Sequence, residues 1–407
     1  MFRIAAFALL AFLLATQSTS PAHDDPPADP PKVKADDKKG GIDRSKATRK
    51  RLLKDFGGSE ESEEAVMLGL AWLTQTQNRD GSWSFDRGGH DHDKATATGM
   101  ALLAFLGAGQ SHKEGRYKET VQAGLNWMVK AVEMDQNRRD RGRFDTITNM
   151  YSQGIATLSL CEAYGMTRDR TLKYPTQAAI DYIQRSQAAN GSWGYESGNP
   201  GDTSIVGWQV QALYAAKLTQ DLEVDDRVIQ KAIRFLDFVG TGNSQEGKSV
   251  YGYTTPGGAP GTSLTAIGLL CRYYLNGWRA DNNGFANGAK GLMRRAPSAT
   301  RERTPLDLYY YYYATQVVRY FGGEEWKKWN EGAQQPDGTR KGGVPEWLIS
   351  MQSKRDVDRG SWDSDTTWIG SNCGRHGTTC LCLLTLEVYY RYDPTQQKSS
   401  DARDGKK

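Results

Sequence analysis

The sequence predicts an all-α fold in which six helical hairpins close into a double ring, an (α/α)6 toroid. One observation is a recurring short pattern: a small residue, an apolar residue, any residue, an aromatic residue and an apolar residue. Its aromatic slot falls at positions 72, 127, 182, 235, 291 (a glycine there) and 347, in steps of 53 to 56 residues. The other observation is that each copy is followed by a loop and a second, more apolar helical stretch. Such a regular period indicates one helical hairpin per repeat.

The first helix of each hairpin is the more charged and is expected to face outward. In the first copy, Ala65, Leu68, Gly69, Trp72 and Leu73 follow helical spacing. The second helices are apolar on most faces, as expected for helices buried by neighbours on both sides. These inner helices are predicted at Ala95–Leu106, Tyr151–Tyr164, Thr203–Ala216, Thr262–Leu275, Leu306–Phe321 and Thr378–Tyr390. Neither terminal repeat shows a polar capping face, which favours a closed ring over an open solenoid.

Both ends of the chain are predicted to lie outside the toroid. Arg3, the apolar run Ile4–Ala15 and the small residues after it predict a secretory signal at residues 1–22. That run of about 12 residues is too short to span a bilayer, although an uncleaved anchor is the alternative. The rest divides into a disordered linker rich in Pro, Asp and Lys at 23–59, the toroid at 60–393 and a polar tail at 394–407. We therefore expect an exported protein, periplasmic, envelope-associated or extracellular, with no transmembrane segment after cleavage.

Composition excludes several classes of protein. Of the 407 residues, 25% are charged and 38% hydrophobic, which suits a folded core and excludes a collagenous or wholly disordered chain. A net charge of only +4 gives no sign of a nucleic-acid partner. The cysteines number five and mostly occupy inner helices. We expect them to pack rather than to form a disulfide framework, with a Cys373–Cys380 bond as the alternative.

Several repeats carry a Gln followed by Gly-Ser-Trp between their two helices. Gln77 precedes Gly81-Ser82-Trp83, Gln187 precedes Gly191-Ser192-Trp193, and Gln352 precedes Gly360-Ser361-Trp362. The Gln amide can bond free backbone groups at a helix end, so the motif is predicted to join outer helix to loop. Over about residues 65–392 the pattern resembles the repeat of the terpene cyclase and protein prenyltransferase superfamily. The repeat that it resembles is called the prenyltransferase and squalene oxidase repeat, and squalene–hopene cyclase-like proteins contain it.

The resemblance implies a buried proton donor if the chain is a cyclase. The superfamily's D-x-D-D-T signature supplies this acid at the start of an inner helix. Asn199-Pro200-Gly201-Asp202-Thr203 keeps the last acid and the Thr, but Gly201 stands in the place of the proton donor. Asp91-His92-Asp93-Lys94 keeps the first two acids, and Asp363-Ser364-Asp365-Thr366 is a third partial match. Asp93 and Asp202 are therefore the candidate catalytic acids, with a solvated acidic loop as the alternative.

The resemblance to prenyltransferases implies a zinc site, which the sequence does not preserve. Asp307-Leu308-Tyr309-Tyr310 matches their D-x-C-Y motif with Tyr309 in place of the Cys ligand. Thr378-Thr379-Cys380-Leu381-Cys382-Leu383 matches their H-x-C-x-C-L motif with Thr378 in place of the His. His376 lies two residues earlier, which turns its side chain far round the helix axis. We therefore expect no metal and no cofactor.

The N-termini of the inner helices are expected to meet at one rim, because all six helices should run the same way. The positive ends of their dipoles suit an anionic or polar ligand. Binding residues predicted at this rim or in the central cavity are His92, Asp307, Tyr309, Trp208 and His376. Tyr309 opens a run of five tyrosines, and for these rings and Trp208 packing between helices is the alternative. A metal at His90, His92 and Asp93 is a further alternative whose spacing is not diagnostic.

Three functions fit these features, and the fold alone does not decide between them. The first is an exported binding or scaffold protein of the cell envelope, holding a small apolar, glycan or peptide ligand or an envelope protein partner. The second is a squalene-cyclase-like isomerase with Asp93 or Asp202 as a relocated acid. The third is a carbohydrate-active toroid enzyme, in which Asp93 pairs with Asp202 or Asp307 at about 5 to 10 Å.

Overall fold

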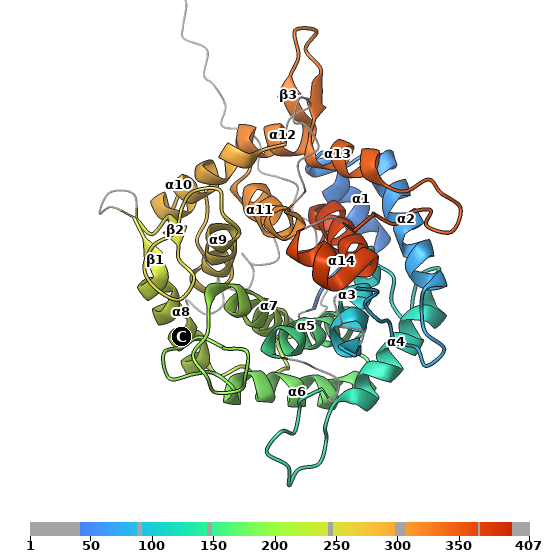
Figure 1. The fold of residues 1–407 in the computed structure, drawn as a ribbon, viewed down its shortest axis with the longest axis vertical. Helices are drawn as coiled ribbons and strands as arrows, with labels where there is room; N and C mark the ends of the chain where they lie inside the picture. Colours follow the sequence, from blue (N-terminus) through green and yellow to red (C-terminus); the bar gives the residue numbers. More distant parts are fainter. Residues whose placement is uncertain are drawn as a thin grey trace, which may run out of the picture. The chain divides into compact units, whose positions relative to one another are not determined.

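Two rings of helices, one inside the other, make up the fold (Figure 1). The computed structural model describes residues 41–87, 92–144, 149–242, 247–297, 307–364 and 367–392, all within the compact unit Lys39–Lys407. The predicted signal, most of the predicted linker and the predicted tail lie outside the described residues. No helix in the described ranges has the length and apolar character needed to cross a membrane.

The outer ring contains the first helix of each repeat. Its members are α2 (Glu60–Gln75), α4 (Lys118–Ala131), α6 (Arg170–Arg185), α8 (Asp226–Val239), α10 (Asn283–Leu292) and α13 (Val344–Met351). Elements outside the repeat are α1 (Lys46–Asp55), α12 (Gly323–Glu331) and the hairpins β1–β2 (Gly240–Thr241, Val250–Tyr251) and β3–β4 (Gly332–Gln334, Arg340–Gly342). Two 3-10 turns, Met293–Arg295 and Glu387–Tyr389, complete the described elements.

The inner ring contains the second helix of each repeat. Its members are α3 (Lys94–Gly107), α5 (Met150–Thr167), α7 (Thr203–Thr219), α9 (Ser263–Asn276), α11 (Leu308–Phe321) and α14 (Trp368–Leu386). Each packs against the next, and α14 returns to pack against α3, so the ring is closed as predicted. The inner helices bury nearly every side chain, which explains why their sequences lack an amphipathic stripe.

The Gln motif joins neighbouring repeats through the backbone. The Nε2 group of Gln77 donates to the carbonyls of Gly81 (2.9 Å) and of Thr120 in the next outer helix (3.0 Å). Gln187 makes the same pair of bonds to Gly191 and Val228. The motif tryptophans are buried, and the indole N–H of each donates 2.7 Å to a carbonyl of its own outer helix. The motif is structural, as the sequence predicted.

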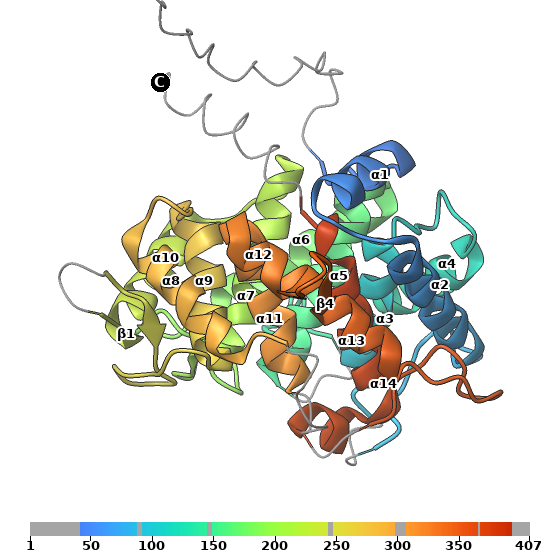
Figure 2. The same cartoon turned by 90° about the horizontal axis from the view of Figure 1, so that it is seen from above.

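The predicted linker boundary is wrong by about one helix. Residues 41–59, expected to be disordered, include α1, which lies over one end of the ring (Figure 2). Leu52 is buried and Ser45 caps the helix by accepting a hydrogen bond from the Thr48 N–H. Charged residues of α1 such as Lys50 and Arg51 lie on its exposed face, and a few buried contacts are enough to hold the helix on the ring.

The sixth inner helix differs from its prediction. It begins at Trp368 rather than Thr378 and is broken at Gly374, whose φ of 62° lies in the left-handed region. A Cβ at Gly374 would lie 2.0 Å from the Asp86 carboxylate. That carboxylate accepts a hydrogen bond from the His376 N–H (3.2 Å), so it caps the restarted helix from another repeat.

Candidate functional site at the N-terminal ends of the inner helices

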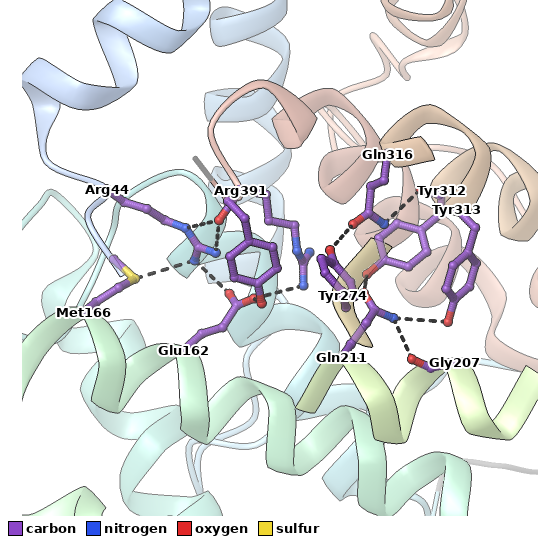
Figure 3. A network of polar contacts seen from close by, with 11 residues as sticks. Arg44, Glu162, Met166, Gly207, Gln211, Tyr274, Tyr312, Tyr313, Gln316 and Arg391 are labelled. Carbon is purple, nitrogen blue, oxygen red and sulfur yellow. Dashed lines mark hydrogen bonds and ion pairs between the residues drawn. The ribbon is translucent and has the colours of Figure 1, made fainter. Parts of the chain in front are cut away.

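A buried ionic network closes the C-terminal end of the inner ring. Arg44 Nη1 lies 2.7 Å from Glu162 of α5, and Arg391 Nη2 lies 3.1 Å from the same carboxylate (Figure 3). The Tyr392 hydroxyl donates to Glu162 at 2.6 Å, and Arg44 Nη2 donates to the Arg391 carbonyl at 2.9 Å. Burial alone would raise the pKa of Glu162, but the guanidinium groups of Arg391 and Arg44 outweigh it and lower that pKa.

Side chains also fill the middle of the inner ring. The Tyr312 hydroxyl donates to Gln211 (2.9 Å), and the Gln211 amide donates to the Tyr313 hydroxyl (3.2 Å) (Figure 3). Trp208 is 2% exposed and stacks on Tyr312 with ring centroids 5.4 Å apart. Trp208 is therefore a packing residue and not the cavity-wall residue that we predicted. The packing alternative for the tyrosine run is correct for Tyr310 to Tyr313, all of them buried.

The aspartates predicted at the rim are helix caps. Asp93 Oδ1 accepts from the Thr96 N–H (3.1 Å), and Asp202 Oδ1 accepts from the Ser204 and Ile205 N–H groups (2.8 and 3.2 Å). Asp307 Oδ1 accepts from the Tyr310 N–H at 3.1 Å. Each carboxylate thus lies at the positive end of an inner helix, which stabilises its negative charge. The rim exists as predicted, and each of these acids already bonds its own helix.

The first turn of α5 links two of these carboxylates. Ser152 Oγ donates to Asp93 Oδ2 at 2.5 Å on one side. On the other side the Tyr151 hydroxyl hydrogen-bonds Ser204 Oγ, which in turn bonds Asp202 Oδ1. Asp93 and Asp202 are 4% and 2% exposed, so both are ordered by neighbours rather than solvated. The structure therefore brings the two candidate acids to neighbouring places on the rim.

Four tyrosines surround Asp202. Tyr151 and Tyr195 have ring centroids 6.0 Å apart, and the Tyr195 and Tyr253 hydroxyls lie 3.4 Å apart. Tyr309 packs edge-on against Tyr313, with centroids 5.1 Å apart. Tyr195 and Tyr253 are 55% and 45% exposed, and Tyr151 and Tyr309 are partly exposed. We call Tyr151, Tyr195, Tyr253, Tyr309 and Asp202 the tyrosine cluster.

The members of the tyrosine cluster raise the pKa of one another's hydroxyl groups. Burial raises the pKa of Tyr151, and the neighbouring Tyr309 and Asp202 raise it further. Burial also raises the pKa of Tyr253, as do hydrogen bonding with Tyr195 and the Asp202 carboxylate. For Tyr309 burial again dominates, and Asp202 adds to the increase in pKa. These hydroxyls therefore stay protonated at neutral pH, and that of the exposed Tyr253 can donate a hydrogen bond to a ligand.

The remaining predicted residues are distributed differently. His92 is exposed at the rim, and Asp307 is half-buried, accepting from Ser263 Oγ at 3.1 Å. His376 is 2% exposed with Nε2 2.9 Å from the Ala97 carbonyl, and burial lowers its pKa. It therefore joins α14 to α3 and is not available for binding. His90 lies outside the described residues, and the described residues contain no cluster of potential metal ligands.

Tyr195 and Tyr253 were not among the residues predicted from the sequence. Both lie in loops that lead from an outer to an inner helix, and the Tyr195 carbonyl accepts from the Met150 N–H of α5 at 3.0 Å. Tyr253 likewise fixes the start of α7, because its carbonyl accepts from the Thr203 N–H at 3.0 Å. Aromatic residues just before predicted inner helices were the available signal, but nothing local indicated which helix each loop would touch.

Neither a family model nor a curated protein sequence matches the chain. Solved structures do match its fold. The α-1,6-mannanase of Salegentibacter sp. HEL1_6 has a TM-score of 0.54 at 8% identity, covering 81% of this chain and 98% of its own. The cellobiose 2-epimerase of Spirochaeta thermophila DSM 6192 has a TM-score of 0.53 at 11% identity, covering 85% and 99%. An α-amylase from Clostridium perfringens has a TM-score of 0.52 at 12% identity, covering 80% and 98%.

The resemblance to terpene cyclases and prenyltransferases is therefore corrected: the structural neighbours are carbohydrate-active α/α toroids. The physical reason lies in the motif that carried the resemblance. Gln77, Gln187 and Gln352 bond only backbone carbonyls, so the motif describes how hairpins are joined in a ring and not the chemistry of a site.

Proposed function

We propose that the protein is a carbohydrate-active enzyme that binds a glycan at the N-terminal ends of its inner helices. The observation that carries the proposal is the tyrosine cluster, in which partly exposed rings surround one ordered carboxylate. Support comes from the neighbours' names: a mannanase, an amylase and a cellobiose epimerase share the fold. An inactive variant of the mannanase has also been solved with α-1,6-mannotriose.

The chemistry of the tyrosine cluster suits a sugar better than an apolar ligand. An aromatic ring offers an apolar face on which a pyranose ring can lie, and its hydroxyl can bond the sugar's polar rim. Tyr195 and Tyr253 are the most exposed rings and would make these contacts, while Tyr151 holds Ser204 and hence Asp202. An apolar terpene would supply no hydrogen-bonding group to the Asp202 carboxylate or to the exposed hydroxyls of Tyr195 and Tyr253.

Asp202 is the residue to which we assign the reactive carboxylate. Its three capping bonds all use Oδ1, so Oδ2 takes no part in capping. A carboxylate held at a helix N-terminus suits the stabilisation of a cationic transition state, because the positive end of the helix stabilises its negative charge. Asp93 uses both oxygens, one for its helix and one for Ser152, and we assign it the positioning of α5. Export through the predicted signal would bring the enzyme to extracytoplasmic glycans.

Asp202→Asn separates the reactive role from the structural one. Asn caps helices as well as Asp does, so the variant keeps the start of α7 but loses the charge. Asp225→Asn is the matched control, because Asp225 caps the outer helix α8 in the same way by accepting from the Arg227 N–H. Both variants should unfold at closely similar denaturant concentrations.

The assay follows turnover of α-1,6-manno-oligosaccharides, malto-oligosaccharides and cellobiose by product chromatography. We expect turnover of at least one of these classes of sugar. Asp202→Asn should lower the turnover rate roughly 100-fold or more, and Asp225→Asn should leave it unchanged. Tyr195→Ala should weaken binding of the same sugar in calorimetry. The proposal is wrong if no sugar is bound or turned over, or if the two Asn variants behave alike.

A further inference from the structure

A cavity lined by arginines lies among the loops that lead from outer to inner helices, as the tyrosine cluster does. It has a volume of about 510 Å³ and is open to solvent. Its lining residues are Gln136, Arg138, Arg139, Arg141, Tyr182, Arg185, Ser186 and Ser197. No acidic residue is among them. We call this the arginine cavity.

Only one of the four arginines is neutralised by ion pairs. Arg138 lies 2.9 Å from both Asp140 and Glu133. Within the described parts of the chain, Arg139, Arg141 and Arg185 form no ion pair with a carboxylate. The Nε of Arg141 is buried without a hydrogen-bond partner in the described chain, so no protein acceptor balances this part of its charge. Three cationic side chains thus converge without a protein anion to balance them.

Side-chain contacts among its own lining residues hold the arginine cavity in shape. Arg185 donates to the Arg141 carbonyl and its guanidinium lies 5.5 Å from the centroid of the Tyr182 ring. Ser197 Oγ donates to Ser186 Oγ at 2.8 Å, which fixes the loop at the far wall. Guanidinium groups favour oxyanions, because their planar fork can make two parallel hydrogen bonds to a carboxylate or a sulfate.

The arginine cavity and the tyrosine cluster share the loop at 186–202. Ser197 lines the cavity, and Tyr195, two residues earlier, belongs to the tyrosine cluster. Arg138, Arg139 and Arg141 lie on the corresponding loop of the second repeat, between α4 and α5. A ligand chain lying over the loop at 186–202 would therefore place one unit against the tyrosines and a neighbouring unit at the arginines.

We propose that the arginine cavity binds the oxyanion of an acidic sugar, so that the preferred glycan carries carboxylate or sulfate groups. The proposal rests on the proposed glycan-binding function of the tyrosine cluster and specifies its substrate class. The volume of the arginine cavity is within the range of ordinary small-ligand sites, so the cavity has room for a whole charged sugar unit and not only for a single ion. Uronate and sulfate ester present the same chemistry to arginine, and the experiment distinguishes them.

The test measures binding of three oligosaccharides of equal length by calorimetry at low salt: one uronate, one sulfated and one neutral. Sodium sulfate alone is a fourth probe. The test variant is Arg141→Gln/Arg185→Gln, and the control is Arg234→Gln, an exposed arginine on the outer helix α8. We expect at least one acidic sugar to bind roughly tenfold or more tightly than the neutral one, with the preference lost in the double variant only. Added salt should reduce the preference.

Each other outcome overturns the proposal in a recognisable way. Equal binding of acidic and neutral sugars, or a double variant that keeps the preference, refutes the arginine cavity but leaves the proposed function intact. Sulfate ion that binds as tightly as the sulfated sugar shows an inorganic anion site instead. If no sugar binds at all, the glycan-binding function itself fails, which the Asp202→Asn assay would confirm independently.

Discussion

The side chain of Gln352 and the backbone of Ala65 close the ring. Gln352 Nε2 donates to the Ala65 carbonyl at 2.8 Å across 287 residues of sequence, and also to the Gly360 carbonyl of its own loop at 2.8 Å. Gln77 and Gln187 make the same two bonds between neighbouring repeats. The junction between the last and first repeats is therefore built like the others, which makes the protein a ring and not a solenoid with two ends.

Replacing Gln352 with Ala should destabilise the fold by about 2 kcal/mol, because two buried carbonyls lose their donor. Gln187→Ala should cost a similar amount, since it removes the same pair of bonds. Gln122→Ala is the control, because Gln122 bonds only Asn126 on an exposed face, and it should change stability by less than about 0.5 kcal/mol. Urea unfolding checks all three. A Gln352→Ala variant as stable as Gln122→Ala would show that other contacts close the ring.

Replacing Glu162 with Gln should destabilise the protein by about 3 to 5 kcal/mol, because it leaves Arg44 and Arg391 buried without their counter-charge. The same change at the exposed Glu324, which pairs with Lys327, should cost less than about 1 kcal/mol. Denaturant unfolding compares the two, and proteolysis reports whether α1 detaches when Arg44 loses its partner. Equal stability of the two variants would mean that the buried network contributes only packing.

Glu387 should make stability fall as pH rises. Both of its carboxylate oxygens are buried without a hydrogen-bond partner in the described chain, and Gly107 leaves room for them, since a Cβ there would lie 1.9 Å from Oε2. Burial raises the pKa of Glu387 well above its usual range, and Glu63 and Glu162 add to this against the opposing charges of Arg391 and Arg44. The unfolded chain ionises near 4.5, so from that pH upward it binds fewer protons than the folded protein.

Glu387→Gln tests this relationship, because an amide cannot ionise. The unfolding free energy of the variant relative to the natural protein should increase from pH 4.5 upward, by up to about 1.4 kcal/mol per pH unit. Urea unfolding between pH 4 and 8 measures it, with Glu324→Gln as the exposed control. Parallel pH profiles for the variant and the natural protein would show that Glu387 is ionised in the folded state.

The local sequence pattern was sufficient to predict most of the inner helices, but it was not sufficient to predict where every element begins. The predicted inner helices agree with α3, α5, α7, α9 and α11, because their apolar character is continuous along the chain. The prediction failed at α1 and at the start of α14, where partners from distant repeats decide the outcome. Asp86, about 290 positions before His376, caps the restarted helix, and no local pattern contains that contact.

The candidate site was only partly predictable for a related reason. Asp202 was found because Asn199–Thr203 partly matches the D-x-D-D-T signature of the cyclases, which lies at the start of an inner helix. Trp208 was misplaced because its face of α7 turns toward Tyr312, which depends on how two helices lie against each other. Tyr195 and Tyr253 were missed because a loop residue gives no periodic signal.

The sequence by itself determined a ring of six helical hairpins, because a regular repeat of apolar faces and Gln-Gly-Ser-Trp loops can be satisfied only by stacking hairpins on one another. Tertiary structure alone decided which polar groups meet. Asp202, Tyr151, Tyr253 and Tyr309 come from different repeats and are brought together only by the packing of those repeats. Tertiary packing also places Glu162 between Arg44 and Arg391 and gathers the arginines of the arginine cavity from two neighbouring repeats. Periodicity encodes what each segment buries, whereas the chemistry of a site depends on distances between segments that no periodicity contains.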